Sequence, residues 1–405
     1  MERRKTEAVV FGGSRYMKKV LLRAPLLSQS GYGVHSRQIL RYLLQAKDVD
    51  VKTQIVPWGI TPWSVDHNAD NGLIGEALSR SIPSVDAGFD VSIQVQLPNE
   101  WDASIATKNV GVTAGVETDF SNPAWTSVHC SKMDLVITPS KHTRDSLLRK
   151  SFTQTEIKIV PETFFDEILS EPKDLPELDN LTTDFNFLAV GVLTGLSPDN
   201  DRKNTLYLIK WFLEEFKDDP DVGLIIKTNR GRETSIDRKL TYDMLRQVLK
   251  EVKSGEFPKI HLLHGNMDRK SMNSLYKHKK VKGFLSATRG EGFGLPFIEA
   301  AAADLPVLAT DWSAHTEFMN LGKWIKFEYD LKEISNDRID GQIFTPGMKW
   351  AEVREADFKK KIRKFRNASS TPKEWAQKTG EVIREKYSWK AICNAYDEAL
   401  GDLLF

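Results

Sequence analysis

The sequence has very few cysteines and no histidine pattern that suggests a bound metal. Its 405 residues include only Cys130 and Cys393, which are too few for a disulfide framework or a cysteine-based zinc site. The eight histidines show no spacing that would assemble a metal site with nearby carboxylates. We therefore expect no metal centre, and a reducing compartment, which favours a cytoplasmic location.

The sequence also lacks a long apolar run and an excess of charge of one sign. No segment approaches the roughly 18 consecutive apolar residues that indicate a transmembrane helix, so no transmembrane segment is expected. The 57 basic and 56 acidic residues give a formal net charge of +1, which does not suggest a protein that wraps nucleic acid. Basic stretches at 277–282 and 359–366 are typical of solvated faces, with a peripheral contact to a membrane as the alternative.

The length and the order of the predicted elements indicate two domains. A single hydrophobic core stops growing at about 250 to 300 residues, and this chain is longer. The segment 171–177, rich in proline and acidic residues, predicts a linker. We expect a flexible extension at 1–16, a first domain at 17–175, a second domain at 176–385 and a C-terminal helix at 386–405 that packs back on the first domain.

Short aliphatic runs alternate with amphipathic stretches, which predicts parallel sheets covered by helices. Strands are expected at 19–23, 51–56, 91–95, 109–113 and 135–138 in the first domain, and at 185–190, 223–227, 260–264, 283–286 and 307–309 in the second. Helices are expected from Val34, over 206–216 and over the tail 375–404. The fold class is therefore α/β, with two doubly wound domains.

One stretch, residues 287–300, carries most of the information about function. Its carboxylates Glu291 and Glu299 are separated by seven residues, with glycines after the first and a helical run around the second. A glycine-rich turn at a helix start exposes N–H groups that hold phosphate oxygens. Carboxylates repel phosphate but accept hydrogen bonds from sugar and ribose hydroxyls, so the combination indicates a nucleotide sugar. The alternative is an ordinary strand-to-helix turn with two solvated glutamates.

The same stretch resembles the retaining glycosyltransferases of family 4, which have the GT-B fold of two Rossmann-like domains facing a cleft. Residues 291–300 match the family's pattern of two glutamates throughout, and 306–310 with Glu317, 136–140 and 387–389 are similar to it as well. The resemblance implies an enzyme that moves a sugar from a nucleotide diphosphate sugar to an acceptor with retention, without a metal or another cofactor.

The resemblance also implies individual roles. Glu299 would hold the ribose hydroxyls and Glu291 would contact the transferred sugar. Gly31 and Gly33, in the predicted loop between the first strand and the first helix, would approach the diphosphate, unless this loop is an ordinary turn. The expected donor-binding residues are Gly31, Gly33, Met267, Gly292, Phe293, Gly294, Leu295 and Glu299.

Arg202 and Lys203 follow the strand at 185–190, where the family has its phosphate-binding cations, and cations there would stabilise the departing diphosphate. The chain departs from the family at Val192, where an arginine is usual, and the two cations could instead be solvated. Asp199 and Asp201 are expected to cap a helix rather than to bind a metal.

In the first domain, Glu117 stands near a strand end where family members place a histidine, and turn capping is its alternative role. The catalytic candidates are therefore Glu291, Arg202, Lys203 and Glu117. His35 is expected at the surface or at a helix start.

Two other classes of function stay open from the sequence. A nucleotide-sugar epimerase shares this fold, and the absent histidine and arginine would also suit a catalytically silent nucleotide-sugar-binding protein. For the transferase, the acceptor could be a glycan, lipid, metabolite, protein or modified nucleobase, and neither it nor the oligomeric state follows from the sequence.

Overall fold

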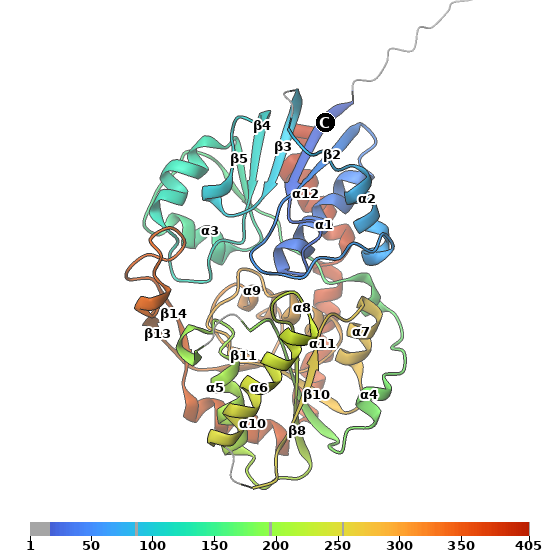
Figure 1. Ribbon diagram of the computed structural model, residues 1–405, viewed down its shortest axis with the longest axis vertical. Helices are drawn as coiled ribbons and strands as arrows, with labels where there is room; N and C mark the ends of the chain where they lie inside the picture. The colour runs from blue at the N-terminus through green and yellow to red at the C-terminus, as the bar shows by residue number, and fades with distance from the viewer. Residues whose placement is uncertain (1–16, 86–87, 194–196, 253–254, 405) are drawn as a thin grey trace, which may run out of the picture.

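The computed structural model describes residues 17–85, 88–193, 197–252 and 255–404. The chain folds into two lobes, each built on a six-stranded parallel sheet with helices on both faces (Figure 1). This confirms the predicted α/β class with two Rossmann-like domains. The predicted extension at 1–16 lies outside the described residues.

The first sheet has the strand order β2-β1-β3-β4-β5-β6. Its strands are β1 Lys18–Ala24, β2 Val49–Ile55, β3 Phe89–Val95, β4 Ala106–Val112, β5 Leu135–Thr138 and β6 Ile157–Ile159, and its helices include α1 Gly31–Gln45, α2 Leu73–Ser79 and α3 Lys141–Leu148. The centre of this sheet is buried on both faces, as the continuous apolar run at 20–22 of β1 requires. The order reverses next to β1, a point where open parallel sheets bind ligands.

The second sheet has the order β12-β11-β10-β7-β8-β9. Its strands are β7 Phe185–Val190, β8 Val222–Thr228, β9 Lys259–His264, β10 Val281–Ser286, β11 Val307–Thr310 and β12 Ile325–Phe327. The helices before and around it are α4 Pro176–Asp179, α5 Thr205–Glu215, α6 Ser235–Val252, α7 Arg269–Lys277, α8 Leu295–Ala302 and α9 His315–Met319. All seven residues of β8 are buried, as in a central strand covered on both faces.

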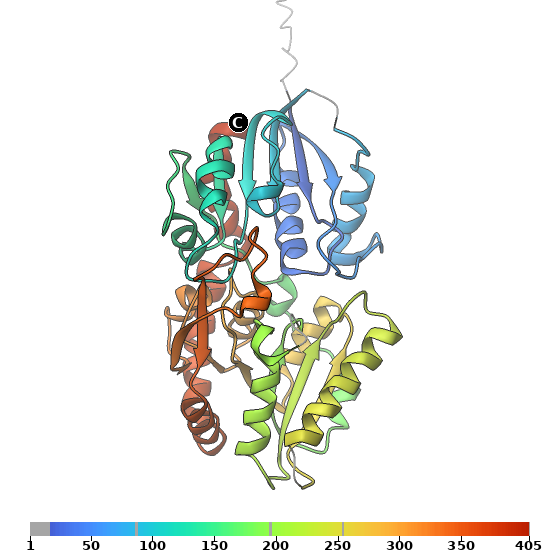
Figure 2. The ribbon, with the colours of Figure 1, turned by 60° about the vertical axis from the view of Figure 1, so that its left-hand side comes forward.

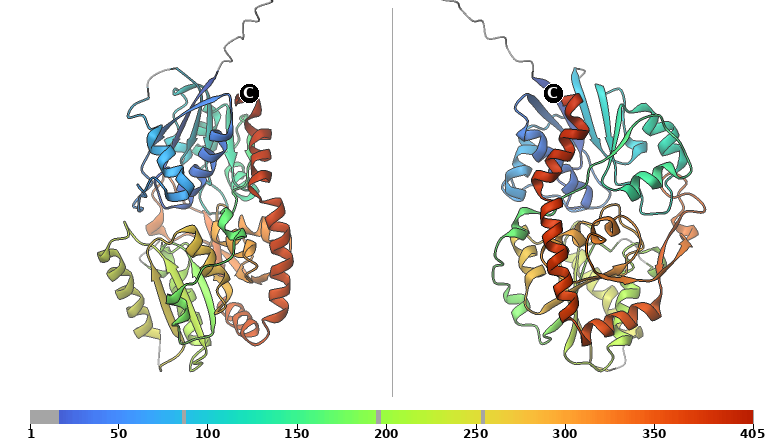
Figure 3. Two further views of the ribbon diagram at one scale, coloured as in Figure 1. Left: turned by 90° about the vertical axis from the view of Figure 1, so that its right-hand side faces the viewer. Right: turned by 180° about the vertical axis from the view of Figure 1, so that it is seen from behind.

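The C-terminal tail returns from the second lobe to the first (Figure 3). It follows α10 Glu355–Asn367 and consists of two helices, α11 Ser370–Lys386 and α12 Trp389–Leu404, so the tail predicted to be helical at 375–404 is interrupted at 387–388. α11 packs on α8, and α12 covers the core of the first domain. The α12 residues buried in that core are Ile392, Tyr396, Ala399, Leu400 and Leu404. No helix among the described residues has the length and apolarity needed to cross a bilayer.

A hairpin that the sequence did not predict links the two lobes on one side (Figure 2). Its strands β13 Tyr329–Glu333 and β14 Lys349–Val353 are antiparallel. At its far end Lys349 and Asp119 exchange two hydrogen bonds, of 2.8 and 2.7 Å. Phe120 of the first domain packs there against Met348 and Trp350. The hairpin therefore holds the first domain against the second beside the candidate site.

Candidate active site

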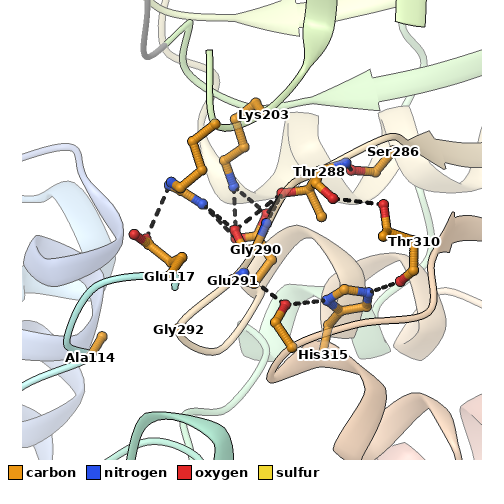
Figure 4. Close-up of polar contacts among 12 residues, drawn as sticks. Ala114, Glu117, Lys203, Ser286, Thr288, Gly290, Glu291, Gly292, Thr310 and His315 are labelled. Carbon is orange, nitrogen blue, oxygen red and sulfur yellow. Dashed lines mark hydrogen bonds and ion pairs between the residues drawn. The ribbon is translucent and has the colours of Figure 1, made fainter. Parts of the chain in front are cut away.

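The catalytic candidates come from two neighbouring strand ends of the second sheet. Arg202 and Lys203 lie between β7 and α5, and the segment 287–294 connects β10 to α8. Because β7 and β10 are paired in parallel, both segments leave the same edge of the sheet. Glu117 leaves the first sheet after β4 and approaches from the other lobe (Figure 4).

Glu291 is the centre of the polar contacts at this edge. Its carboxylate accepts hydrogen bonds from Lys203 Nζ at 2.7 and 2.8 Å and from Thr288 Oγ1 at 2.8 Å. Its side chain is only 6% exposed. Burial opposes ionisation, but the charges of Lys203 and Arg202 outweigh it and lower the pKa of Glu291 to about 2. The site therefore holds a carboxylate that stays ionised at neutral pH.

Arg202 connects this carboxylate to the first domain. Its Nη1 donates to the carbonyl of Gly290 at 2.6 Å and lies 3.4 Å from Glu291 Oε2, while Nη2 lies 3.3 Å from Glu117 Oε1. The cluster thus joins two cations and two carboxylates from both domains. Its two positive and two negative charges balance. A polar ligand can therefore replace one of these contacts without leaving a large net charge in the cluster.

The glycines of the 287–294 segment allow it to pass close to the first domain. A Cβ on Gly290 would lie 2.4 Å from the carbonyl oxygen of Glu117, and one on Gly292 would lie 2.7 Å from that of Ala114. The carbonyl of Gly292 accepts from Ser140 Oγ at 2.8 Å. These glycines are therefore required for close packing between the domains, and any side chain there would push the lobes apart.

Two residues that the sequence analysis did not select support Glu291, Ser313 directly and His315 through Ser313, whose Oγ lies 3.5 Å from His315 Nδ1. The backbone N–H of Glu291 donates to Ser313 Oγ at 2.9 Å. His315, which is fully buried, lies 2.8 Å from the carbonyl of Thr310 through Nε2, so Nε2 carries the proton. Burial lowers the pKa of His315 to about 4, which keeps the ring neutral. The signal was present, because Ser313 and His315 lie just before Glu317 in the stretch that resembles the family.

Glu299 and Met267 lie apart from this cluster, in a cavity lined by residues of both domains. Glu299 Oε2 accepts from Tyr276 Oη at 2.9 Å. Burial between the lobes raises the pKa of Glu299 to about 7, although the hydrogen bond from Tyr276 and the charge of Arg269 both act to lower it. Buried Glu162 of the first domain has its pKa raised to about 8 by burial and by the charge of Glu299.

The predicted loop at Gly31 and Gly33 is the first turn of α1, so the prediction of a helix from Val34 is wrong by three residues. The side chain of Ser30 caps this helix by accepting from Gly33 N at 3.2 Å. A Cβ on Gly33 would lie 1.9 Å from the carbonyl oxygen of Ser28, so only glycine fits. A Cβ on Gly31 would lie 4.0 Å from Leu295. The positive end of α1 therefore faces the start of α8 across the domain boundary.

Three other sequence candidates lie outside the cluster. Asp201 accepts from Thr205 N at 2.7 Å through its side chain, in agreement with the predicted capping role. His35 lies near the start of α1, as one of its two predicted positions required, but it is buried and lies 3.2 Å from Tyr396 Oη of α12 rather than at the surface. Val192 is 42% exposed after β7. Over the described ranges, no group of three or more His, Cys, Asp or Glu residues is arranged to hold a metal ion.

Residues 203–340, which include Lys203, Glu291 and Glu299, match the sequence model of the family described as glycosyl transferases group 1. No curated protein sequence matches the chain.

Several solved structures share the whole fold. Sucrose-phosphate synthase from Thermosynechococcus elongatus is similar over 95% of this chain and 99% of its own, with 12% identity and a TM-score of 0.62. HepE from Anabaena, solved in complex with UDP and glucose, is similar over 95% of this chain and 100% of its own, with 14% identity and a TM-score of 0.60.

A third structure, described as trehalose-6-phosphate from E. coli bound with UDP-2-fluoro glucose, covers 95% of this chain and 99% of its own at 12% identity and a TM-score of 0.58. The chain spans only 57% of the pneumococcal O-GlcNAc transferase GtfA. Residues 203–340 thus resemble the group 1 glycosyl transferases, and the two lobes have the GT-B fold of these solved structures.

Proposed function

We propose that this protein transfers a sugar from a nucleotide diphosphate sugar to a hydroxyl acceptor, with retention of the anomeric configuration and without a metal. The observation that carries the proposal is the ionised Glu291 held by Lys203 and Arg202, opposite Glu117 of the first domain. A carboxylate accepts hydrogen bonds from sugar hydroxyls, and the cations match a diphosphate. HepE in complex with UDP and glucose and the E. coli structure with UDP-2-fluoro glucose make a UDP-sugar the first donor to test.

The proposed reaction breaks the bond between the anomeric carbon and the phosphate oxygen. The electron pair leaves with the diphosphate, and Lys203 and Arg202 stabilise the charge that grows on it. The acceptor hydroxyl attacks from the face that the diphosphate leaves, and its proton passes to the departing phosphate oxygen. Glu291 orients the sugar by its hydroxyls, so this scheme needs no carboxylate nucleophile.

The nucleoside would occupy the cavity that contains Glu299 and Met267. Its lining combines apolar side chains such as Phe164 with charged ones such as Lys227, as small-molecule sites do. Glu299, already a hydrogen-bond acceptor for Tyr276, can accept from ribose hydroxyls through its second oxygen. The cavity adjoins the cluster through α8, which begins at Leu295 and carries Glu299.

The proposal predicts thermal stabilisation by a nucleoside diphosphate and turnover of one nucleotide sugar. At about 100 times its dissociation constant, a ligand should raise the free energy of unfolding by roughly 2.7 kcal/mol. The stabilising donor is then incubated with candidate acceptors, and NMR of the product reports the anomeric configuration.

Transfer should persist after exhaustive chelation. Epimerisation of the donor in the absence of an acceptor would indicate a nucleotide-sugar epimerase. Binding without turnover would indicate a catalytically silent binding protein. Activity that is lost on chelation and restored only by magnesium or manganese would contradict the metal-free scheme.

Glu299→Ala should weaken donor binding by about 1.5 to 3 kcal/mol, because two ribose hydroxyls lose a charged acceptor. The raised pKa of Glu299, about 7, also predicts that donor affinity of the unmodified protein increases as the pH rises through 7 and the carboxyl group ionises. Isothermal calorimetry between pH 6 and pH 8 measures both effects. Equal affinity in the variant, or a flat pH profile, would remove Glu299 from the donor site.

A further inference from the structure

An ion pair between the domains closes one side of the cavity that contains Glu299. Arg269 Nε of the second domain lies 3.0 Å from Asp70 Oδ1 of the first. The two side chains are 22% and 17% exposed, and both line the cavity. The two residues are 199 positions apart in the sequence. This contact therefore exists only while the two lobes are closed on each other.

Asp70 is held in place from within the first domain. Its other carboxylate oxygen is bonded to Nε of Arg37, whose side chain is 1% exposed. Asp70, Asn71 and Gly72 have positive φ angles of 52°, 57° and 85°. Asp and Asn adopt this left-handed conformation more readily than other non-glycine residues, and the bond to Arg37 holds the Asp70 side chain in place. The carboxylate therefore projects toward the second domain from a defined position.

Arg37 transmits this contact to the start of α1. Its Nη1 donates to the carbonyls of Leu26 at 2.9 Å and Ser28 at 2.8 Å. A Cβ on Gly33 would lie 3.2 Å from the same Nη1. A series of polar contacts thus runs from Arg269 through Asp70 to Arg37. It ends next to Gly33, in the first turn of α1, which faces α8.

Arg269 also acts on Glu299. Its charge favours the ionised form of Glu299 and opposes the effect of burial on the pKa of that group. The other titratable groups that act on Glu299 are Tyr276, which donates a hydrogen bond, and Glu162, the buried carboxyl group of the first domain. Arg269 is the cation among them.

We propose that Asp70 is a positioning residue for donor binding: from the first domain it holds Arg269 beside Glu299, and so couples closure of the two lobes to occupancy of the nucleoside cavity. The inference rests on the proposed function, in which Glu299 accepts the ribose hydroxyls. It assigns a role to a residue outside the two-glutamate motif.

A double-mutant cycle with UDP as the probe tests the coupling. Calorimetry compares the wild-type protein with Asp70→Asn, Arg269→Gln and the double variant. Each single variant should bind UDP several-fold more weakly, and the double variant should lose about fivefold less than the product of the two single losses, because the two residues act as one unit. Asp166→Asn is the matched control: it breaks the 2.7 Å pair with Arg41, which lines the same cavity but lies in the same domain, and should show no coupling to Arg269→Gln.

The pH profile separates this role from a merely structural one. Arg269→Met removes the cation and should move the midpoint of UDP binding to higher pH, whereas Arg269→Lys should restore it. Multiplicative losses in the cycle, or an unshifted midpoint in Arg269→Met, overturn the inference while leaving the proposed function intact. A wild-type protein that binds neither UDP nor another nucleoside diphosphate contradicts the proposed function and this inference together.

Discussion

Lys203→Ala should lower the turnover rate by on the order of 100-fold or more while donor affinity changes much less. Negative charge grows on the diphosphate as the bond to the sugar lengthens, and a preorganised cation stabilises that state more than the ground state. Lys203 is 15% exposed and bonded to Glu291 at 2.7 Å, so the ammonium is already fixed before any ligand arrives. Arg202→Ala should have an effect of similar size. The two losses should not multiply, because both cations share Glu291.

Single-turnover kinetics at saturating donor measures this effect. Lys210→Ala is a suitable control, since Lys210 lies on the following helix α5, is 41% exposed and reaches Glu214 only at 4.0 Å. Near-normal rates in both cluster variants would assign Arg202 and Lys203 to structure alone. Lys227 would then be the next candidate, because it lines the cavity and burial lowers its pKa to about 8.

Glu291→Ala should reduce the free energy of unfolding by about 3 to 5 kcal/mol, in addition to abolishing transfer. The substitution leaves the ammonium of Lys203 buried without its main partner and removes one of the two carboxylates that contact Arg202. Glu76→Ala, which breaks an exposed pair with Arg80, should cost less than about 1 kcal/mol. Urea denaturation of both variants gives the comparison.

The pH dependence of this stabilisation has a defined sign. The pKa of Glu291 is lowered from 4.5 to about 2 in the folded protein, so the folded state binds the proton less tightly than the unfolded chain. The contribution is complete above about pH 4.5 and is lost as the pH falls toward 2. The difference in unfolding free energy between wild type and Glu291→Gln should therefore shrink over that interval. A difference that stays constant would mean that the pairing with Lys203 does not stabilise the fold.

Two positions depart from the pattern of the family that the sequence resembles, and the structure shows what surrounds one of them. The chain has Val192 where an arginine is usual and Glu117 where a histidine is usual, and Glu117 lies 3.3 Å from Arg202. A carboxylate from the first domain thus pairs with a cation of the second at the place where the proposed reaction occurs. This arrangement gives the site its own bridge across the domain boundary, beside the separate bridge of Asp70 and Arg269.

The sequence by itself determined the elements whose signal is local. The apolar run of β8, the helical periodicity of α5 and the turn from Glu291 to Gly294 each depend on residues that are close together in the chain. The fold class followed from the alternation of such elements, and the expected enzyme class from the resemblance of residues 291–300 to a known family.

Tertiary structure alone decided the features that depend on distant residues. Strand β13 is exposed over most of its length, and β14 buries Trp350, Ala351 and Val353 without strict alternation. The pairing of these two strands, rather than a local pattern, therefore forms the hairpin. The tail divides at Tyr387 and Ser388 because α11 packs on the second domain and α12 packs on the first. The contacts of Arg202 with Glu117 and of Arg269 with Asp70 join groups from separate domains. Local sequence carries no information on such pairs, because packing of the two lobes is what brings their charges within reach.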